Sequence, residues 1–468
     1  MENSVHKKLP MNVKWLFASG DFAKTLLVVM TAAFSLYFYT DIIGMDPKVV
    51  AMIILIAKIW DFINDPMMGA LVDRTKSKEG KCRMWLKYMS VPGGVVLALN
   101  FIMPELSVTG KIVWVAITYT LQGMASTALM IPQNTLMSRI TTDPAERASI
   151  NGYRGYFGLA ANLIVSSFGV PFVQLAGNGD MRRGFAIFGI VCGVVYAINY
   201  LIVYFCTKGY EPMESAPAVT HNAAPEVKEK IKTSEVLTNW PWLVVLLSYF
   251  CTMIAASVSG STGLYYAQYN LGDINIYSVM NFIGIVGAVL VYPLMGSLVK
   301  KFGNAKLVFF GSLIAAVAYL FRFVTADANI WIIYIGYFIG SFGQTLASCV
   351  VMLVVYDSYI YMEHKTGKPA PEALLVSGYS VSYKVGMALA TPLAGWLLGM
   401  VPFVSGAAVQ EKSVLNLFFY ENTLLPAVSF VISGLLGLLL IKFDKQIQAY
   451  KAIDAAAAQG HTIEDTNN

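Results

Sequence analysis

The sequence predicts an all-α membrane protein with twelve transmembrane helices in two six-helix halves. Of its 468 residues, 56% are hydrophobic and only 13% are charged, whereas soluble domains carry about 25% charged residues. Twelve apolar runs approach the roughly 20 residues that a helix needs to cross a bilayer, and a polar stretch divides them six and six. The net charge of +5 is spread over the loops, so we do not expect a nucleic-acid partner.

The twelve expected spans follow one another along the chain with short connections. The first six lie at roughly 15–39, 48–72, 84–103, 111–138, 150–175 and 184–206. The second six lie at roughly 241–268, 275–299, 305–323, 329–358, 373–402 and 421–441. We therefore expect a six-helix bundle over residues 1–206, a cytoplasmic linker rich in Ala, Pro, Glu and Lys over 207–239, a second bundle over 240–445, and a cytoplasmic tail over 446–468.

The distribution of lysine and arginine predicts the orientation. Loops on the side of the N-terminus contain 22 basic residues, and those on the opposite side contain five, namely Lys48, Lys111, Arg182, Arg183 and Lys412. Because cytoplasmic loops carry the excess of basic residues, both termini and the linker are predicted to be cytoplasmic.

The two halves also resemble each other. Asp65–Arg74 aligns with Tyr292–Lys301 at an offset of 227, and Asn151–Tyr153 aligns with Ser377–Tyr379 at an offset of 226. This indicates a parallel duplication, which places a binding cavity between the halves near the membrane midplane. The stretches Gly69–Arg74 and Gly296–Lys301 resemble the helix 2–3 and 8–9 signature of the major facilitator superfamily.

Three charged residues lie inside the second span. Asp61 and Asp65 are four residues apart and Lys58 precedes Asp61 by three, so one helix face carries all three. A charge at the bilayer centre costs about 2.5 to 17 kcal/mol, so this face must line a polar interior. Paired carboxylates with the Asn64 amide suit Na⁺ or Li⁺, and a proton is the alternative. The competing interpretation is an internal ion pair of the acids with Lys58 or with a base on another helix.

Other charges inside the spans suit a polar solute. Asp21 and Arg154 lie on different helices of the first half, and Lys384 lies on a helix of the second. Arginine and aspartate can contact the hydroxyl groups of a sugar. Alternatively, Asp21 pairs with Lys24, and Arg154 extends toward the membrane surface. All four histidines fall in tails or loops, so coupling to a cation would depend on carboxylates.

Lys58–Gly69 (KIWDFINDPMMG) resembles the helix II signature of the glycoside–pentoside–hexuronide:cation symporters, a family that includes the bacterial melibiose permease. Further similar segments occur along most of the chain: Gly20–Ala23, Tyr37–Asp41, Ile117–Met124, Lys365–Lys368 and Lys384. The resemblance implies a facilitator-type fold, cation-coupled sugar uptake, and residence in the cytoplasmic membrane of a bacterium.

The resemblance also implies roles for individual residues. The cation site of the family corresponds to Asp61, Asn64, Asp65 and Thr127, so Asp61 and Asp65 would be ligands of Na⁺. Its sugar contacts correspond to Asp21, Arg154 and the helix XI lysine, Lys384. Where melibiose permease carries an acidic sugar ligand and a stacking tryptophan, this chain has Met130 and Asn134. We therefore expect poor melibiose transport, and a solute that either tolerates an apolar neighbour or carries a negative charge.

The leading interpretation is a symporter of a sugar or glycoside driven by Na⁺, Li⁺ or H⁺, without a cofactor and acting as a monomer in the lipid bilayer. A facilitator-type transporter of a non-sugar solute, such as a lipid or organic anion, is the alternative. A channel or receptor fits the six-plus-six repeat poorly. A membrane enzyme would need a histidine, a nucleophile or a metal cluster in the spans, and none is evident in the sequence.

Overall fold

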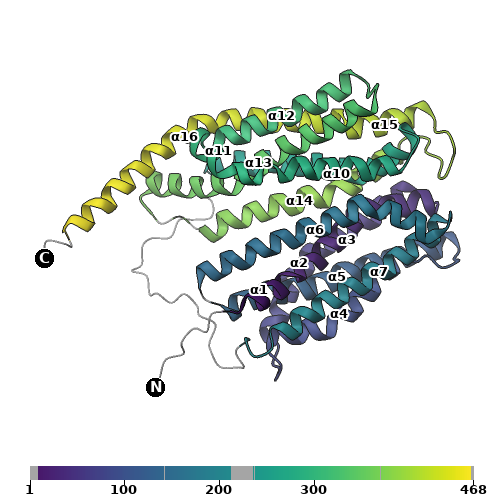
Figure 1. The fold of residues 1–468 in the computed structure, drawn as a ribbon, viewed down its shortest axis with the longest axis horizontal. Helices are drawn as coiled ribbons and strands as arrows, with labels where there is room; N and C mark the ends of the chain where they lie inside the picture. The colour runs from purple at the N-terminus through teal and green to yellow at the C-terminus, as the bar shows by residue number, and fades with distance from the viewer. Residues whose placement is uncertain are drawn as a thin grey trace. The chain divides into compact units, whose positions relative to one another are not determined.

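The computed structural model describes residues 9–141, 143–211, 236, 238–368, 370 and 372–464. The described segments are helical, and they group into two compact units (Figure 1). Unit 1 comprises Met1–Thr220, Gly260–Asn281 and Thr391–Leu417. Unit 2 comprises His221–Ser259, Phe282–Ala390 and Phe418–Asn468. Most of the linker predicted at 207–239 lies outside the described residues.

The helices of the first half follow the predicted spans closely. They are α1 (Met11–Ala18), α2 (Gly20–Tyr37) continued by η1 (Phe38–Ile42), α3 (Pro47–Arg74), α4 (Lys81–Asn100), α5 (Val108–Ile140), α6 (Pro144–Gly177) and α7 (Met181–Cys206). Local sequence explains where two of them begin. Pro47 occupies the first turn of α3 behind the Asp46 side chain, which accepts from the Lys48 amide at 2.8 Å, and Ser107 caps α5 through the Gly110 amide.

The second half shows the same agreement, with two interruptions. Its helices are α9 (Trp240–Tyr265) continued by η2 (Tyr266–Asn270), α10 (Asn275–Val289), η3 (Tyr292–Leu294), α11 (Met295–Phe302), α12 (Asn304–Val324), α13 (Ile330–Thr366), α14 (Glu372–Leu398), α15 (Lys412–Asn422) and α16 (Leu424–Glu464). The span predicted at 275–299 breaks before Pro293, which cannot donate a helical hydrogen bond. The last predicted span, 421–441, is preceded by α15, which begins at Lys412 and ends at Asn422, and is continued by α16 to Glu464.

Nine of the helical segments in the described part are long and apolar enough to cross a membrane by composition alone. Three more have the necessary length but are more polar: α3 with 28 residues, α4 with 20 and α14 with 27. Helix α3 is the clearest case, because Lys58, Asp61 and Asp65 lie in its middle. Together these segments account for the twelve predicted spans.

Glycine allows close helix packing in both units. In unit 1, a methyl group added at Gly94 of α4 would lie 2.3 Å from the Gly193 carbonyl oxygen of α7. In unit 2, one added at Gly343 of α13 would lie 2.6 Å from the Gly311 carbonyl oxygen of α12. These helices therefore touch through their backbones, as membrane helices do when small residues face each other.

Asp41 of η1 joins the three segments of unit 1. Its carboxylate accepts hydrogen bonds from the Tyr269 hydroxyl and, at 3.2 Å, from the Gly406 amide. The Ser405 hydroxyl donates to the Asp41 carbonyl at 2.6 Å. Residues 260–281 and 391–417 therefore belong to the same compact unit as the first seven helices.

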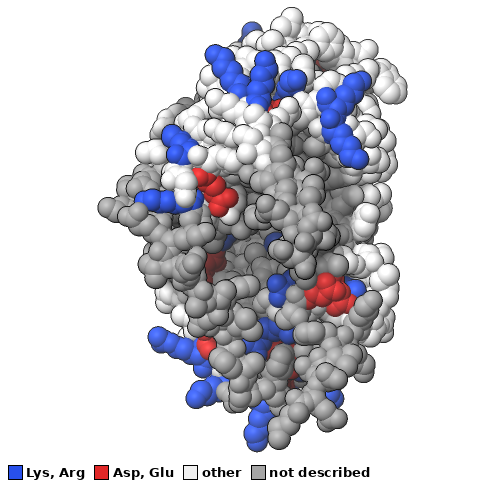
Figure 2. All heavy atoms as spheres, turned by 90° about the vertical axis from the view of Figure 1, so that its left-hand side faces the viewer, with Lys and Arg blue, Asp and Glu red and all other residues white. Residues whose placement is uncertain are grey.

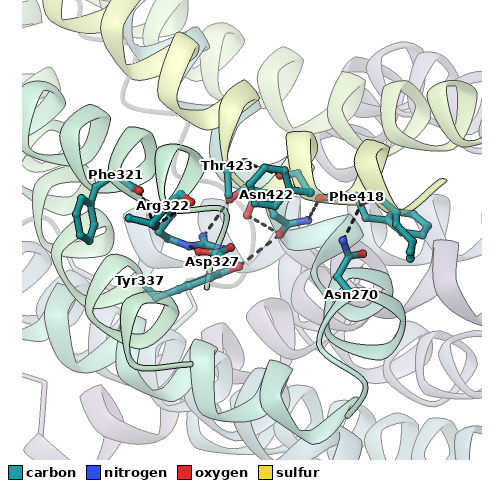
Figure 3. Close-up of polar contacts among 12 residues, drawn as sticks. Asn270, Phe321, Arg322, Asp327, Tyr337, Phe418, Asn422 and Thr423 are labelled. Atoms are coloured by element: carbon teal, nitrogen blue, oxygen red, sulfur yellow. Dashed lines mark hydrogen bonds and ion pairs between the residues drawn. The ribbon is translucent and has the colours of Figure 1, made fainter. Parts of the chain in front are cut away.

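Arg322 forms a buried polar network in unit 2 (Figure 3). Its side chain is fully buried and pairs with Asp327 through two bonds, Nη2–Oδ2 at 2.7 Å and Nε–Oδ1 at 3.1 Å. Its Nη1 donates to the Asn422 carbonyl at 3.0 Å, and the guanidinium lies 4.7 Å from the centre of the Tyr337 ring. The sequence marks Arg322 as a charge inside a span, and the fold gives it a structural partner in the turn after α12.

Candidate functional site

The residues predicted to bind a cation come together between α3 and α5 in unit 1. The Thr127 hydroxyl of α5 donates to Asp65 Oδ1 of α3 at 3.0 Å. One helical turn earlier on each helix, Asp61 Oδ1 lies where a methyl group on Gly123 would be, 2.1 Å from that position. Both acids of α3 therefore lie against a single face of α5.

Lys58 forms an ion pair with Asp61. Its Nζ lies 3.5 Å from Asp61 Oδ2 and 5.8 Å from the centre of the Tyr119 ring. Charge-assisted hydrogen bonds are typically about 2.7–2.9 Å long, so this ion pair is loose. The other acid, Asp65, has its hydrogen bond from Thr127. The ion pair with Lys58 therefore does not by itself account for the position of Asp65 against Thr127.

Asn64 supplies the neutral member of this group. Its side chain is 7% exposed, and its Nδ2 atom has no hydrogen-bond partner among the described residues. A cation would bind the Asn64 amide through its oxygen, Oδ1, because the Nδ2 group can only donate hydrogen bonds. The carboxylates, amide and hydroxyl offer hard oxygen ligands to a monovalent cation. In the described part of the chain, His, Cys, Asp and Glu do not gather in groups of three or more that could hold a metal ion.

Gly123 allows Asp61 to approach α5, and it provides a test. We expect Gly123→Ala to lower the apparent affinity for the coupling cation at least tenfold, because the methyl group would displace the Asp61 carboxylate from its place. The measurement is solute uptake as a function of Na⁺ concentration. Gly69→Ala on α3 is the matched control, since a methyl group there meets nothing within 4 Å. An unchanged cation dependence in Gly123→Ala would contradict the placement of Asp61 in the site.

The residues predicted to contact the solute in unit 1 form a second cluster, between α2, α5 and α6. Asp21 of α2 and Arg154 of α6 form an ion pair through two hydrogen bonds, from Nε to Oδ2 and from Nη2 to Oδ1 at 3.2 Å. Arg154 Nη2 also donates to Asn134 Oδ1 of α5 at 2.7 Å. Arg154 is thus part of an interhelical network, and Asp21 has Arg154 as its ion-pair partner.

Met130 and Lys384 are the two other residues predicted to contact the solute. Met130 of α5 is half-buried, one turn before Asn134. Lys384 is exposed on α14 in unit 2. Beside Lys384 is an aromatic stack in which Tyr249 lies 4.9 Å from Tyr379 and 6.3 Å from Tyr383, measured between ring centres.

Sequence reasoning missed several residues of the two clusters. Gln133 Nε2 donates to Asp21 Oδ2 at 3.3 Å, and Asn151 Oδ1 accepts from Arg154 Nη1 at 3.3 Å. Gly123 and Tyr119 border Asp61 and Lys58. The available signal was position in the sequence. Gln133 is adjacent to Asn134, and Asn151 precedes Arg154 by three residues, about one helical turn. Gly123 carried none, because its role arises only when α3 and α5 pack.

Comparison with known proteins agrees with this architecture. Residues 16–445 match the family described as MFS/sugar transport protein. An isoprimeverose transporter from Lactiplantibacillus pentosus is 27% identical over 447 residues, which cover 94% of this chain and 91% of that protein. A putative glycoside/cation symporter from Escherichia coli strain K12 is 27% identical, with 98% of each chain covered.

The fold also has solved counterparts. A bacterial homologue of the human lysosomal transporter Spinster superposes with a TM-score of 0.64 over 96% of this chain and 99% of its own, at 11% sequence identity. The predicted fold class and family resemblance are confirmed, and the family consists of transporters rather than enzymes. The chain therefore belongs to the MFS/sugar transport family, as a multi-pass membrane protein similar to glycoside symporters.

Proposed function

We propose that this protein is a symporter that couples the uptake of a sugar or glycoside to the entry of a monovalent cation, Na⁺, Li⁺ or H⁺. The observation that carries the proposal is the pair of acids on α3. Asp61 lies against Gly123 of α5, and Asp65 accepts a hydrogen bond from Thr127 of α5. The buried Asn64 lies between the two acids in the sequence. Charges placed inside a membrane segment are costly and mark ion pathways. Similarity to a putative glycoside/cation symporter supports the same activity.

Helix α5 connects the two clusters and gives coupling a physical route. Thr127 contacts the cation cluster and Asn134 contacts the sugar cluster, seven residues further along the helix. This separation corresponds to two turns, or about 10 Å along the axis. Coupling requires that a bound cation stabilises the position of α5 to which sugar binds, typically by about 1–3 kcal/mol of coupling free energy. A bound sugar must then increase the affinity for the cation by the same factor. Alternating access would follow from rocking of the two halves around the site.

The direct test is uptake by purified protein in proteoliposomes. A panel of labelled pentosides, hexosides and uronides is offered with an inward Na⁺ gradient, with an inward H⁺ gradient, and with neither. We expect accumulation of at least one glycoside to depend on one of the gradients. Equilibration without accumulation under both gradients would contradict symport, and uptake of none of the sugars would contradict a sugar substrate.

The orientation proposed from the sequence has a separate test. Figure 2 views the end of the molecule at which α16 projects in Figure 1, and lysine and arginine side chains are prominent there. A reporter inserted within Glu214–Glu229, or fused after Asn468, should read as cytoplasmic. A periplasmic signal from either fusion would overturn the assignment based on basic residues.

A further inference from the structure

The guanidinium of Arg154 already has an acceptor for each of its five N–H groups. Nε and one N–H of Nη2 bind Asp21. The other N–H of Nη2 binds Asn134 Oδ1 at 2.7 Å. Nη1 donates to Asn151 Oδ1 at 3.3 Å and contacts the Met137 sulfur at 3.6 Å. Since arginine has five donors and no acceptor, its hydrogen-bonding capacity is used within unit 1.

Asp21 is held in this pair from a second side. Gln133, which is 1% exposed, donates from Nε2 to Asp21 Oδ2 at 3.3 Å. A methyl group on Gly20 would lie 2.4 Å from this Nε2, so the amide rests directly on the α2 backbone. The side chains of Asp21 and Arg154 are only 11% and 12% exposed. The ion pair is therefore enclosed and braced, rather than a loose surface contact.

The side-chain amides of Asn134 and Asn151 carry the hydrogen-bond donors that could bind a solute at this cluster. Asn134 and Asn151 are both exposed, and each turns its oxygen toward the guanidinium, because a guanidinium can only donate. Their Nδ2 groups therefore point away from Arg154 as neutral N–H donors. Such donors suit the hydroxyl and ring oxygens of a sugar and carry no charge to attract a carboxylate or sulfonate.

We propose that this cluster selects an uncharged glycoside over an anionic sugar, with Asn134 and Asn151 as the residues that determine specificity. The proposal rests on the sugar-transport function proposed above and specifies its substrate class. An anionic sugar could bind Arg154 only by replacing Asp21, which would leave the Asp21 carboxylate enclosed beside a second negative charge. A neutral sugar leaves the ion pair intact and accepts hydrogen bonds from the two amides.

The test uses sugars matched in everything except charge. Uptake of a transported neutral glycoside is competed with methyl β-glucoside, methyl β-xyloside and methyl β-glucuronide at pH 7. We expect a neutral competitor to act at a concentration at least tenfold lower than the glucuronide, a difference of about 1.4 kcal/mol. Equal or stronger competition by the glucuronide would overturn the inference while leaving sugar transport established. Uptake of none of the sugars would instead refute the proposed function, and this inference with it.

Variants separate the ion pair from its surroundings. Asp21→Asn releases the Arg154 charge, so the ratio of glucuronide to glucoside binding should rise at least tenfold. Asn134→Ala should weaken glucoside binding without improving glucuronide binding, because the ion pair remains. Glu105→Gln, which removes a carboxylate from an exposed loop, should leave the ratio unchanged. Binding is measured by ligand-induced thermal stabilisation of the purified proteins, so it can be determined even for a variant that no longer transports. An unchanged ratio in Asp21→Asn would contradict the role of the closed ion pair.

Discussion

Replacing Asp65 by asparagine should abolish cation-driven accumulation while the protein remains folded in the membrane. Asparagine keeps a side-chain oxygen that can accept the hydrogen bond from Thr127, so the contact between α3 and α5 at 3.0 Å survives. The substitution removes the negative charge that would attract the cation. Because neither α3 nor α5 contains a histidine, these helices offer no titratable histidine to replace the lost carboxylate.

The measurement compares the steady-state solute ratio across proteoliposomes with and without the ion gradient. In Asp65→Asn the two values should coincide. Glu105→Gln, which removes an exposed loop carboxylate, should accumulate solute as the unmodified protein does. Normal Na⁺- or H⁺-dependent accumulation by Asp65→Asn would remove this residue from the cation site.

Breaking the Arg322–Asp327 pair should cause a large loss of stability without altering the site. Arg322 is fully buried and is held by two charge-assisted bonds to Asp327. Removing one member of a buried pair leaves an uncompensated charge and typically costs about 3–5 kcal/mol. We expect Asp327→Leu and Arg322→Leu each to lower the melting temperature of the detergent-purified protein markedly.

The double variant makes this prediction specific. Arg322→Leu with Asp327→Leu leaves neither charge, so it should be more stable than either single variant. The exposed pair of Lys81 and Asp73, 2.9 Å apart, is the matched control, because surface pairs contribute about 0–1 kcal/mol. If the loss of stability in the double variant equals the sum of the losses in the two single variants, an uncompensated charge is not the cause of the destabilisation.

The sequence predicted the helices well because apolar runs of membrane length have few alternative structures. It placed the last span at roughly 421–441, with Glu421, Asn422 and Thr423 at its start. In the structure α15 ends at Asn422 and α16 begins at Leu424, and the Asn422 and Thr423 side chains donate hydrogen bonds to the Phe418 and Phe419 carbonyls. Polar residues that satisfy themselves locally are therefore compatible with a span.

The candidate site was predictable to the extent that it lies on one helix. Helical spacing put Lys58, Asp61 and Asp65 on a common face, and α3 has that geometry. Spacing could not show that Gly123 would admit Asp61, or that Gln133 and Asn151 would brace the Asp21–Arg154 pair. Those contacts join different helices, and they depend on how closely the backbones approach, which no local pattern encodes.

The backbone contacts between paired helices limit how the protein can deform. At Gly94 and Gly193 each helix touches the carbonyl of the other, with a separation that would admit no methyl group. Sliding one helix past its partner would bring these carbonyls against neighbouring side chains, so close packing opposes shear within the α4–α7 pair. Helix α4 also packs on α5, which contacts both clusters. We therefore expect motion that begins at either cluster to occur at contacts other than the α4–α7 pair, which should move as one block.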